Sequence, residues 1–337
     1  MKILVTGAFG NVGSNVTASL LDLGHSVRAL SAEEARDAPV AATFGNRIEV
    51  VRGDVRRPED LDTAVDGCDA IVHLAFVIPP LCLEQPKTSR DINVGGTRNV
   101  IEAARRAAQK SGGAPRLVFA STLDVYGHTS HLPPPRRTDD PVEATDLYTE
   151  HKIECEEMVR SSGLQWAILR FADVPPIALR DPHPIMFTIP LAQRIEMIHP
   201  RDIGLAVARA VGHDAVWGRV LNIGGGRSCQ LTYGQYLESL LEAMGIGALP
   251  PEWFTTDPYC TDWLDTDESQ RLLQYQRHDF QDVVRETAAL LGWRAPLVRL
   301  LRPLLRRRIG RLAKIAADAR PQPLPRNGKV PSPPMGG

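Results

Sequence analysis

The stretch that most constrains the fold is "KILVTGAFGNVG", residues 2–13, at the start of the chain. A run of strand-forming residues is followed by three glycines, Gly7, Gly10 and Gly13, spaced three apart. A helical pattern then begins near Val12. Glycines placed in this way turn the chain tightly, let backbone N–H groups approach a pyrophosphate and let the helix pack closely on the strand. The stretch therefore predicts a dinucleotide-binding strand–loop–helix unit.

Apolar runs rich in Val, Ile and Leu recur along the chain, with longer helical patterns between most of them. Strands that read as continuous apolar stretches, such as "AIVHLA" and "RLVFA", are typical of parallel sheets covered on both faces. We therefore predict an α/β protein with a Rossmann-like, doubly wound parallel sheet and a smaller C-terminal substrate-binding lobe. The predicted strands lie at residues 2–5, 26–30, 48–51, 70–74, 116–120, 165–170 and 219–223.

The character of the sequence changes near residue 172, where prolines break the stretch "DVPPIALRDPHPIMFTIP". We predict that residues 1–171 form the dinucleotide-binding domain, which the strand at 219–223 rejoins. Residues 172–296 are predicted to form the substrate-binding lobe.

The last forty or so residues, 297–337, are different in kind, because "LVRLLRPLLRRRIGRLAKI" is basic and amphipathic and Pro303 should interrupt its helix. We favour a helix that lies on the body of the protein. Contact of residues 297–315 with an anionic membrane surface or a partner is the less favoured interpretation. The Pro-rich end of the chain is expected to be disordered.

Composition narrows the class of protein. The chain has 337 residues, 43% apolar and 23% charged, with a net charge of −1, so no overall charge favours nucleic acid. The five cysteines are scattered without a CxxC pair or metal-ligand spacing, which predicts reduced thiols and no metal site. No signal segment or long apolar run is visible, so we expect a cytoplasmic protein.

The end of the second predicted strand bears on the coenzyme. Ser31 stands where an acidic residue would chelate the ribose hydroxyls of NAD. Its small side chain leaves room for a 2′-phosphate, with Arg28 or Arg36 as partners, whereas Glu33 and Glu34 would repel that phosphate. The coenzyme is predicted to be NAD or NADP, with a slight preference for NADP.

Other positions near the strand ends complete the predicted cofactor site. Asp54 follows the third strand and either accepts a hydrogen bond from the adenine amino group or serves as a turn or helix-capping carboxylate. His73 lies on a buried strand and is interpreted as a core histidine rather than a catalytic base. The remaining predicted cofactor-binding residues are Gly7, Phe9, Gly10, Asn11, Val12, Gly13, Val55, Leu74, Ala75, Tyr148 and Lys152.

Eight short stretches, in this order, resemble a known family: "TGAFGNVG", "GDV", "HLA", "NVGGTRNV", "ASTLDVYG", "YTEHK", "HPRDIG" and "LNIGGG". The chain is similar to the extended short-chain dehydrogenase/reductases, also called the NAD-dependent epimerase/dehydratase family, from residue 1 to about 295. The resemblance implies an enzyme that moves a hydride to or from a nicotinamide.

The chemistry of such a transfer can be assigned to residues. A carbonyl that receives hydride needs a proton donor, and Tyr148 is the candidate. A free tyrosine has a pKa of about 10, so a nearby cation is needed to favour the phenolate, and Lys152 lies four residues on, on the same side of a helix. Thr122, at the end of the fifth strand, would polarise the carbonyl, with Ser121 as the neighbouring alternative.

The resemblance also suggests two features that the spacing does not. Asn93 matches the family's asparagine that orders a proton-relay water, although it could equally cap its helix. The helices carrying residues 93–106 and 148–159 would pair with their counterparts in a homodimer.

Departures from the family pattern bear on the reaction. Dehydratases of this family carry two acidic residues after the catalytic Thr, whereas this chain has Leu123 and then Asp124. Asp173 would repel the diphosphate of a sugar nucleotide, and the apolar segment 175–195 suits a modest, hydrophobic substrate. The predicted substrate-binding residues are Ser121, Asp124, Ile185, Met186, Phe187 and Arg194.

These observations predict an NAD(P)-dependent oxidoreductase that interconverts a ketone and a secondary alcohol of a small, fairly apolar molecule. Two alternatives remain. One is a nucleotide-sugar epimerase with tightly bound NAD, and the other is a non-catalytic regulator that binds the dinucleotide.

Overall fold

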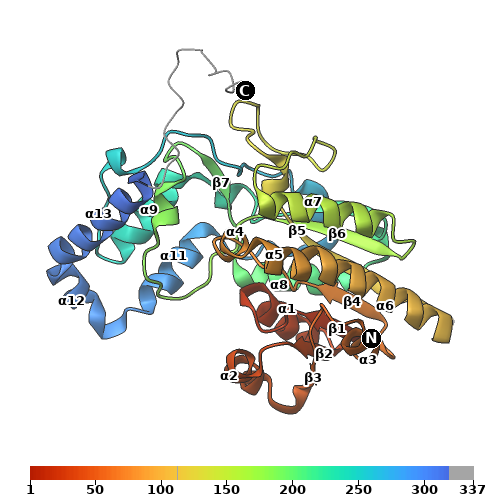
Figure 1. Ribbon diagram of the computed structural model, residues 1–337. Helices are drawn as coiled ribbons and strands as arrows, with labels where there is room; N and C mark the ends of the chain where they lie inside the picture. The colour runs from red at the N-terminus through yellow and green to blue at the C-terminus, as the bar shows by residue number, and fades with distance from the viewer. Residues whose placement is uncertain (112, 319–337) are drawn as a thin grey trace, which may run out of the picture.

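The structure is a computed structural model that describes residues 1–111 and 113–318 (Figure 1). In these residues a seven-stranded sheet has the order β3-β2-β1-β4-β5-β6-β8, and every pairing in it is parallel. The predicted α/β class and all the predicted strands are confirmed. The strands are β1 (Lys2–Thr6), β2 (Ser26–Ser31), β3 (Ile48–Arg52), β4 (Ala70–His73), β5 (Arg116–Thr122), β6 (Trp166–Phe171) and β8 (Arg219–Ile223).

Alternate residues of each strand enter two different cores, as the two-residue period of a strand requires. Ile3 and Val5 pack with helices on one face of the sheet, whereas Leu4 packs with helices on the other. The first face is covered by α1 (Asn11–Asp22) and α8 (Pro200–Val211). The second face is covered by α3 (Pro58–Val65), α6 (Gly96–Ser111) and α7 (Leu147–Arg160). Short helices α2 (Glu34–Phe44), α4 (Leu81–Glu84) and α5 (Pro86–Arg90) complete this half.

A third core lies in the C-terminal part of the chain, on the left in Figure 1. It joins the 3₁₀ turn η4 (Pro184–Phe187) to a small antiparallel pair and several helices. These are β7 (Arg194–Glu196), β9 (Gln230–Thr232), α9 (Tyr233–Ala243), α11 (Phe280–Ala289), α12 (Ala295–Leu300) and α13 (Arg302–Asp318), with α10 (Asp267–Leu273) nearer the sheet. Residues 172–296 are therefore divided between the sheet half and the third core, because α8, which lies within this span, packs against α1 on the sheet.

The basic segment near the C-terminus forms α12 and α13 and lies on the body of the protein, as favoured from the sequence. Pro303 stands in the first turn of α13, where a missing N–H removes no helical hydrogen bond, so one helix ends and another begins there. The Pro-rich end of the chain, expected to be disordered, falls outside the described residues. No helix in the described ranges has the length and apolar character needed to cross a membrane.

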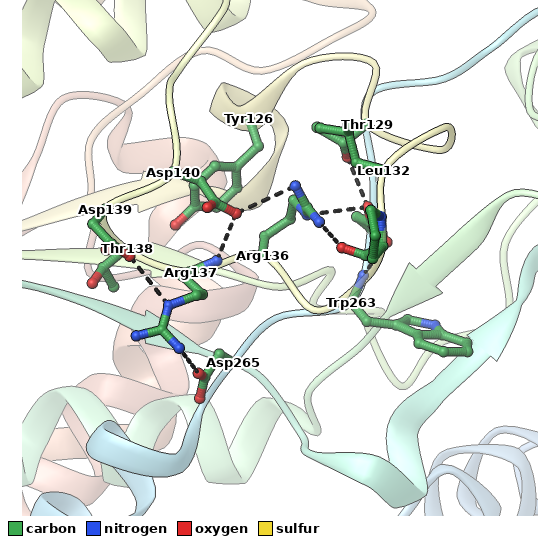
Figure 2. A network of polar contacts seen from close by, with 12 residues as sticks. Tyr126, Thr129, Leu132, Arg136, Arg137, Thr138, Asp139, Asp140, Trp263 and Asp265 are labelled. Carbon is green, nitrogen blue, oxygen red and sulfur yellow. Dashed lines mark hydrogen bonds and ion pairs between the residues drawn. The ribbon is translucent and has the colours of Figure 1, made fainter.

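The loop after β5 is fixed by a buried arginine. Figure 2 shows Arg136 between Asp140 and the loop that carries Thr129 and Leu132. The Arg136 guanidinium contacts the Asp140 carboxylate at 3.3 Å, and its backbone N–H donates to the Trp263 carbonyl at 2.7 Å. The loop is thereby held against the chain near residue 263, beside the carboxyl ends of β5 and β6.

Candidate functional site

The loop between β1 and α1 has the shape that the glycines predict. Gly7 has a φ of +71°, and a Cβ there would lie 2.9 Å from the Ala75 nitrogen. A Cβ on Gly13 would clash with the Gly7 carbonyl oxygen, because α1 packs closely on the loop. Gly10 precedes α1 and no side chain caps the helix, so its first N–H groups face outward. This cradle fits a pyrophosphate group at the positive end of α1.

A cleft of about 580 Å³ extends from this loop along the carboxyl ends of the strands. Six predicted cofactor residues lie in the cleft lining besides Gly7: Phe9, Gly10, Asp54, Val55, Leu74 and Ala75. Asn11 and Val12 do not line it, because the Asn11 amide donates to the Val174 carbonyl at 2.9 Å and Val12 packs against the core. The other predicted cofactor residues outside the lining are Gly13, Ser31, Tyr148 and Lys152.

Ser31 does not face the cleft as an open hydroxyl. Its Oγ donates a hydrogen bond of 2.7 Å to Oδ2 of Asp37, a carboxylate that lines the cleft beside Glu33 and Arg36. Arg36 contacts the other Asp37 oxygen at 3.3 Å. The sequence analysis missed Asp37. This residue lies in α2, six positions after Ser31, and only the fold of the chain between β2 and α2 brings it back to the strand end.

Arg28, proposed above as a phosphate partner, is wrong for that role. Its guanidinium donates to the carbonyls of Ala64 and Asp66 at 2.8 and 2.7 Å and pairs with Glu49 at 3.0 Å. Alternate strand residues point to opposite faces of the sheet, and Arg28 points to the face that α3 covers. The carboxylate of Asp54 lines the cleft but is paired with Arg56 at 2.9 Å, and this hydrogen bond lowers the pKa of Asp54.

The three predicted catalytic residues come together at the carboxyl ends of β5 and β6. The Thr122 hydroxyl acts on the Tyr148 phenol as a hydrogen-bond partner and lowers its pKa, against the larger effect of burial. The Lys152 ammonium lies 5.8 Å from the centre of the Tyr148 ring, as residues four apart on α7 should. The N-terminus of α7 is set by Asp146, whose carboxylate accepts from the Thr149 N–H at 2.8 Å in a capping box.

Burial controls the proton affinities of this group. Burial raises the pKa of Tyr148, and the negative charge of Asp124 raises it further, so the phenol is neutral in the protein alone. Burial also lowers the pKa of Lys152 to about 7. The Lys152 ammonium donates to the Ala120 carbonyl at 2.7 Å.

Phe76 is a site residue that the sequence analysis missed. The Lys152 ammonium lies 3.6 Å from the centre of the Phe76 ring, a cation–π distance. The Phe76 ring packs nearly perpendicular to the Tyr148 ring, with 5.9 Å between the two ring centres, and it also lines the cofactor cleft. Its position directly after "HLA" was the available signal.

Asn93 neither begins nor caps a helix, so the capping alternative is wrong. It lies in a π-helical turn, η2 (Asp91–Gly95), between α5 and α6. Its amide accepts from the Val77 N–H at 2.7 Å and donates to the Val77 carbonyl at 3.0 Å, which fixes the wall of the cleft. His73 is a core histidine as predicted: it contacts the hydroxyls of Thr6 and Thr97 at 2.7 and 3.0 Å, and burial lowers its pKa to about 3.

Ser121 is wrong as a substrate or catalytic hydroxyl. It is 3% exposed and donates at 2.6 Å to Glu156, one turn beyond Lys152 on α7. The Glu156 carboxylate also receives two hydrogen bonds from Arg170, at 2.9 and 2.8 Å. Strands β5 and β6 and helix α7 are joined by this buried cluster, so it positions Tyr148 and Lys152 opposite Thr122.

Two carboxyl groups lie beside the tyrosine. Thr122 and Phe171 are paired in the sheet, and Asp124 and Asp173 each follow two residues later on their chains. Burial and the neighbouring charge of Asp173 raise the pKa of Asp124 well above its usual value. The Asp173 side chain faces a cavity inside the protein. Burial by the surrounding protein raises its pKa to about 6.

That cavity has a volume of about 660 Å³ and is mostly apolar. Of the predicted substrate residues, Ile185 and Met186 line it. Phe187 does not, because it is fully buried against Phe254, 5.1 Å between ring centres. Arg194 is also wrong, because its guanidinium pairs with Asp262 at 2.9 Å. Missed lining residues from α9, α11 and α13 include Tyr233, Tyr236, Leu240, Val283, Leu305 and Ile309.

The model of the NAD dependent epimerase/dehydratase family matches residues 3–175. The chain belongs to this family. Curated relatives include a 3 beta-hydroxysteroid dehydrogenase/Delta 5→4-isomerase from Mycobacterium tuberculosis, 34% identical over 170 residues, which are 47% of this chain and 42% of the relative. A UDP-glucose 4-epimerase from Streptomyces lividans is 33% identical over 173 residues, 48% of this chain and 49% of that protein. These matches span less than half the length of the relatives.

Solved structures match more of the chain. A dTDP-glucose 4,6-dehydratase from Streptomyces venezuelae, solved as a double mutant with NAD bound, has a TM-score of 0.69 and 26% identity, and the match covers 88% of this chain and 100% of that one. A UDP-glucose 4-epimerase from Stenotrophomonas maltophila has a TM-score of 0.71 at 20% identity, over 89% and 99% of the two chains, which shows a shared fold.

Proposed function

We propose that this family member is an NAD-dependent dehydrogenase that interconverts a secondary alcohol and a ketone on an apolar substrate of about the size of a sterol. The observation that carries the proposal is the apolar cavity whose lining includes Asp173, a carboxyl group whose negative charge raises the pKa of Tyr148. Its volume lies within the usual range for small-molecule sites, about 300–1,000 Å³.

The lining of the cavity supports this substrate class over a sugar nucleotide. Most lining side chains are Ile, Leu, Met, Val and Tyr, and the lining also includes a carboxylate, Asp173. The two lining arginines, Arg180 and Arg308, are matched by two lining carboxylates, Asp173 and Asp181, and Arg308 pairs with Asp181 at 3.3 Å, so the lining has no excess positive charge for a diphosphate. The relative named 3 beta-hydroxysteroid dehydrogenase fits the same substrate class.

The residues of the chain have distinct roles in this reaction. When bound in the cleft, the nicotinamide supplies or receives the hydride. Tyr148 gives its proton to the carbonyl oxygen in reduction or takes the hydroxyl proton in oxidation, and the Thr122 hydroxyl holds the same oxygen. A protonated Lys152 favours the phenolate through its positive charge. The apolar walls exclude water from the reacting carbon.

The coenzyme we propose is NAD rather than NADP, which reverses the slight preference drawn from Ser31. Asp37 presents a carboxylate at the end of β2, held by the Ser31 hydroxyl, with Glu33 nearby in the lining. Such carboxylates suit ribose hydroxyls and repel a 2′-phosphate. Solved structures of similar fold carry NAD, in agreement with this choice.

Titration calorimetry with NAD and NADP tests the coenzyme. The wild-type protein should bind NAD more tightly, and Asp37→Ala should reduce the preference at least tenfold. Arg36→Ala is the matched control from the same helix, and it should leave NAD the preferred coenzyme. Tighter binding of NADP by the wild-type protein would contradict the proposal.

Turnover assays test the reaction. With NAD and hydroxysteroids as probe alcohols, NADH should accumulate, whereas UDP-glucose should give neither NADH nor a 4-epimer. Tyr148→Phe should lower kcat by about 10²–10⁴-fold, as is typical for loss of general acid–base catalysis. Tyr275→Phe removes a hydroxyl bonded to Ser269 and Gly224 away from the cleft, and it should keep wild-type kcat. Epimerisation of a sugar nucleotide without net NADH would instead favour the epimerase alternative.

A further inference from the structure

The outer face of α12 and α13 exposes large apolar side chains. Trp293 is 80% exposed, Leu300 is 76% and Leu304 is 64%. Leu297 and Leu301 are also exposed, and the five residues together are here called the outer stripe, which runs from the 3₁₀ turn η8 (Gly292–Arg294) through α12 to the first turn of α13: Trp293, Leu297, Leu300, Leu301 and Leu304. Figure 1 shows α12 and α13 in blue, at the end of the molecule away from the sheet.

The same helices carry an unusual concentration of positive charge. Residues 293–318 contain eight Arg or Lys residues against a single acid, Asp318, in a chain whose net charge is −1. Arg308 is paired with Asp181, and Arg306 donates to backbone carbonyls near residue 247. Among the described residues no carboxylate pairs with the exposed side chains of Arg307, Arg311 and Lys314.

The opposite face of these helices is already occupied, which fixes the orientation of the outer stripe. Ile309, Ala313 and Ala316 of α13 are buried in the third core. Val298 and Leu305 line the apolar cavity. The helices are therefore docked through one face, and Leu300 and Leu304 remain mostly in contact with water, where they contribute little to the stability of the fold.

We propose that the outer stripe and the arginines around it form a docking surface for a membrane that contains anionic phospholipid. Exposed leucine and tryptophan side chains suit the boundary between lipid headgroups and acyl chains, and arginine side chains reach from that depth to the phosphates. An apolar patch alone would suit another protein equally well. The unpaired cations around it favour a negatively charged lipid surface.

The location of the cavity gives the docking surface a use. Because α12 and α13 carry the stripe on one face and part of the cavity wall on the other, docking places that wall against the bilayer. Docking then keeps the cavity close to the phase in which an apolar alcohol concentrates. This consequence rests on the proposed function, whereas lipid binding itself does not.

Vesicle co-sedimentation of the full-length protein tests the docking surface. The protein should bind vesicles of phosphatidylcholine with phosphatidylglycerol, should not bind phosphatidylcholine alone, and should be released as salt screens the charges. The double variant Leu300→Glu/Leu304→Glu should bind at least about tenfold more weakly, because two apolar contacts are replaced by charges that the lipid repels. Val50→Glu, at an exposed site on β3, is the matched control and should bind as the wild type does.

The outcomes separate the two proposals. Equal binding by the Leu300→Glu/Leu304→Glu variant and the wild type, or no binding to the anionic vesicles, would overturn the docking surface. Concentration-dependent dimerisation that the double variant abolishes, without vesicle binding, would overturn it in favour of self-association. The double variant should oxidise a water-soluble alcohol at the wild-type rate. If the wild-type protein binds the anionic vesicles but oxidises no alcohol, the proposed function is refuted and the docking surface is not.

Discussion

Replacing Arg170 with methionine should destabilise the fold far more than replacing Arg160 with methionine, although both guanidinium groups contact the same carboxylate. Glu156 receives hydrogen bonds from Arg170 at 2.9 and 2.8 Å and from Arg160 at 3.1 Å. The difference lies in exposure, because the Arg170 side chain is 3% exposed and that of Arg160 is 37% exposed.

The magnitudes follow from this difference. Breaking a buried pair leaves Glu156 enclosed without its main partner, which costs about 3–5 kcal/mol of unfolding free energy. Losing an exposed pair costs about 0–1 kcal/mol. With an unfolding entropy of about 2.1 cal/mol/K per residue over the whole chain, Arg170→Met should lower Tm by roughly 4–7 °C and Arg160→Met by at most about 1.5 °C.

The destabilisation should also depend on pH in a defined direction. Burial alone would raise the pKa of Glu156, but the hydrogen bonds and charge of Arg170 outweigh it and hold that pKa below its usual value of 4.5. In the wild type the pair therefore stabilises the fold above this value and loses its effect as pH falls through the lowered pKa. In Arg170→Met burial raises the pKa of Glu156, which then takes up a proton in mild acid. The deficit should be largest near neutral pH and smaller at about pH 4.

Urea unfolding followed by tryptophan fluorescence, at neutral and acid pH, measures these free energies. The two variants share the carboxylate, the type of substitution and the loss of one positive charge. If they are equally destabilised at neutral pH, or if the Arg170→Met deficit grows in acid, the argument from burial is refuted.

Three further outcomes follow from the site. Gly13→Ala should lose about 1–3 kcal/mol of unfolding free energy and bind NAD poorly, because its Cβ meets the Gly7 carbonyl oxygen. The Cβ of Gly10→Ala lies 3.5 Å from the same oxygen, so this variant should lose less than about 1 kcal/mol. Urea unfolding measures both values. Lys152→Met should be more stable than the wild type below pH 7 and lose this advantage towards pH 10. The reason is that burial lowers the Lys152 pKa from 10.5 to about 7, so the native state gains stability as pH rises between these values; thermal melts against pH check it. Phe76→Ala removes a cation–π contact that favours the Lys152 ammonium but also lets water reach it. Because burial is the largest cause of the lowered pKa, hydration should outweigh the lost contact and raise the pKa above 7, and an unchanged pH profile of kcat/KM would contradict this.

The strands could be predicted because the signals that define them are local. Parallel strands such as β4 and β5 are buried on both faces, so their sequences are continuously apolar, and the glycine loop marks the first of them. The register of Tyr148 and Lys152 was equally local, since four residues on a helix bring two side chains to one face. The π-helical turn at Asn93 has no such signal, because it depends on the hydrogen bonds of the side chain to Val77.

The errors of the sequence analysis share a physical cause. Ser121, Phe187 and Arg194 were chosen for their chemistry and their nearness in sequence to the site, but the direction of each side chain is decided by a partner far along the chain. Ser121 turns to Glu156, Phe187 to Phe254 and Arg194 to Asp262. A residue type predicts what a side chain can do, and only packing predicts where it points.

The apolar cavity shows the same limit at a larger scale. Its walls come from segments as distant as Asp173, Tyr236 and Ile309, and none of these carries a pattern of its own that predicts a cavity. The basic helix could be predicted, since charge and spacing are local, but its two faces acquire different roles only after α13 packs on the third core. One face of α13 then encloses the apolar cavity and the other presents Leu304 to the surroundings. Since a single helix carries both, a substitution such as Leu304→Glu tests the outer face without altering the residues that line the cavity.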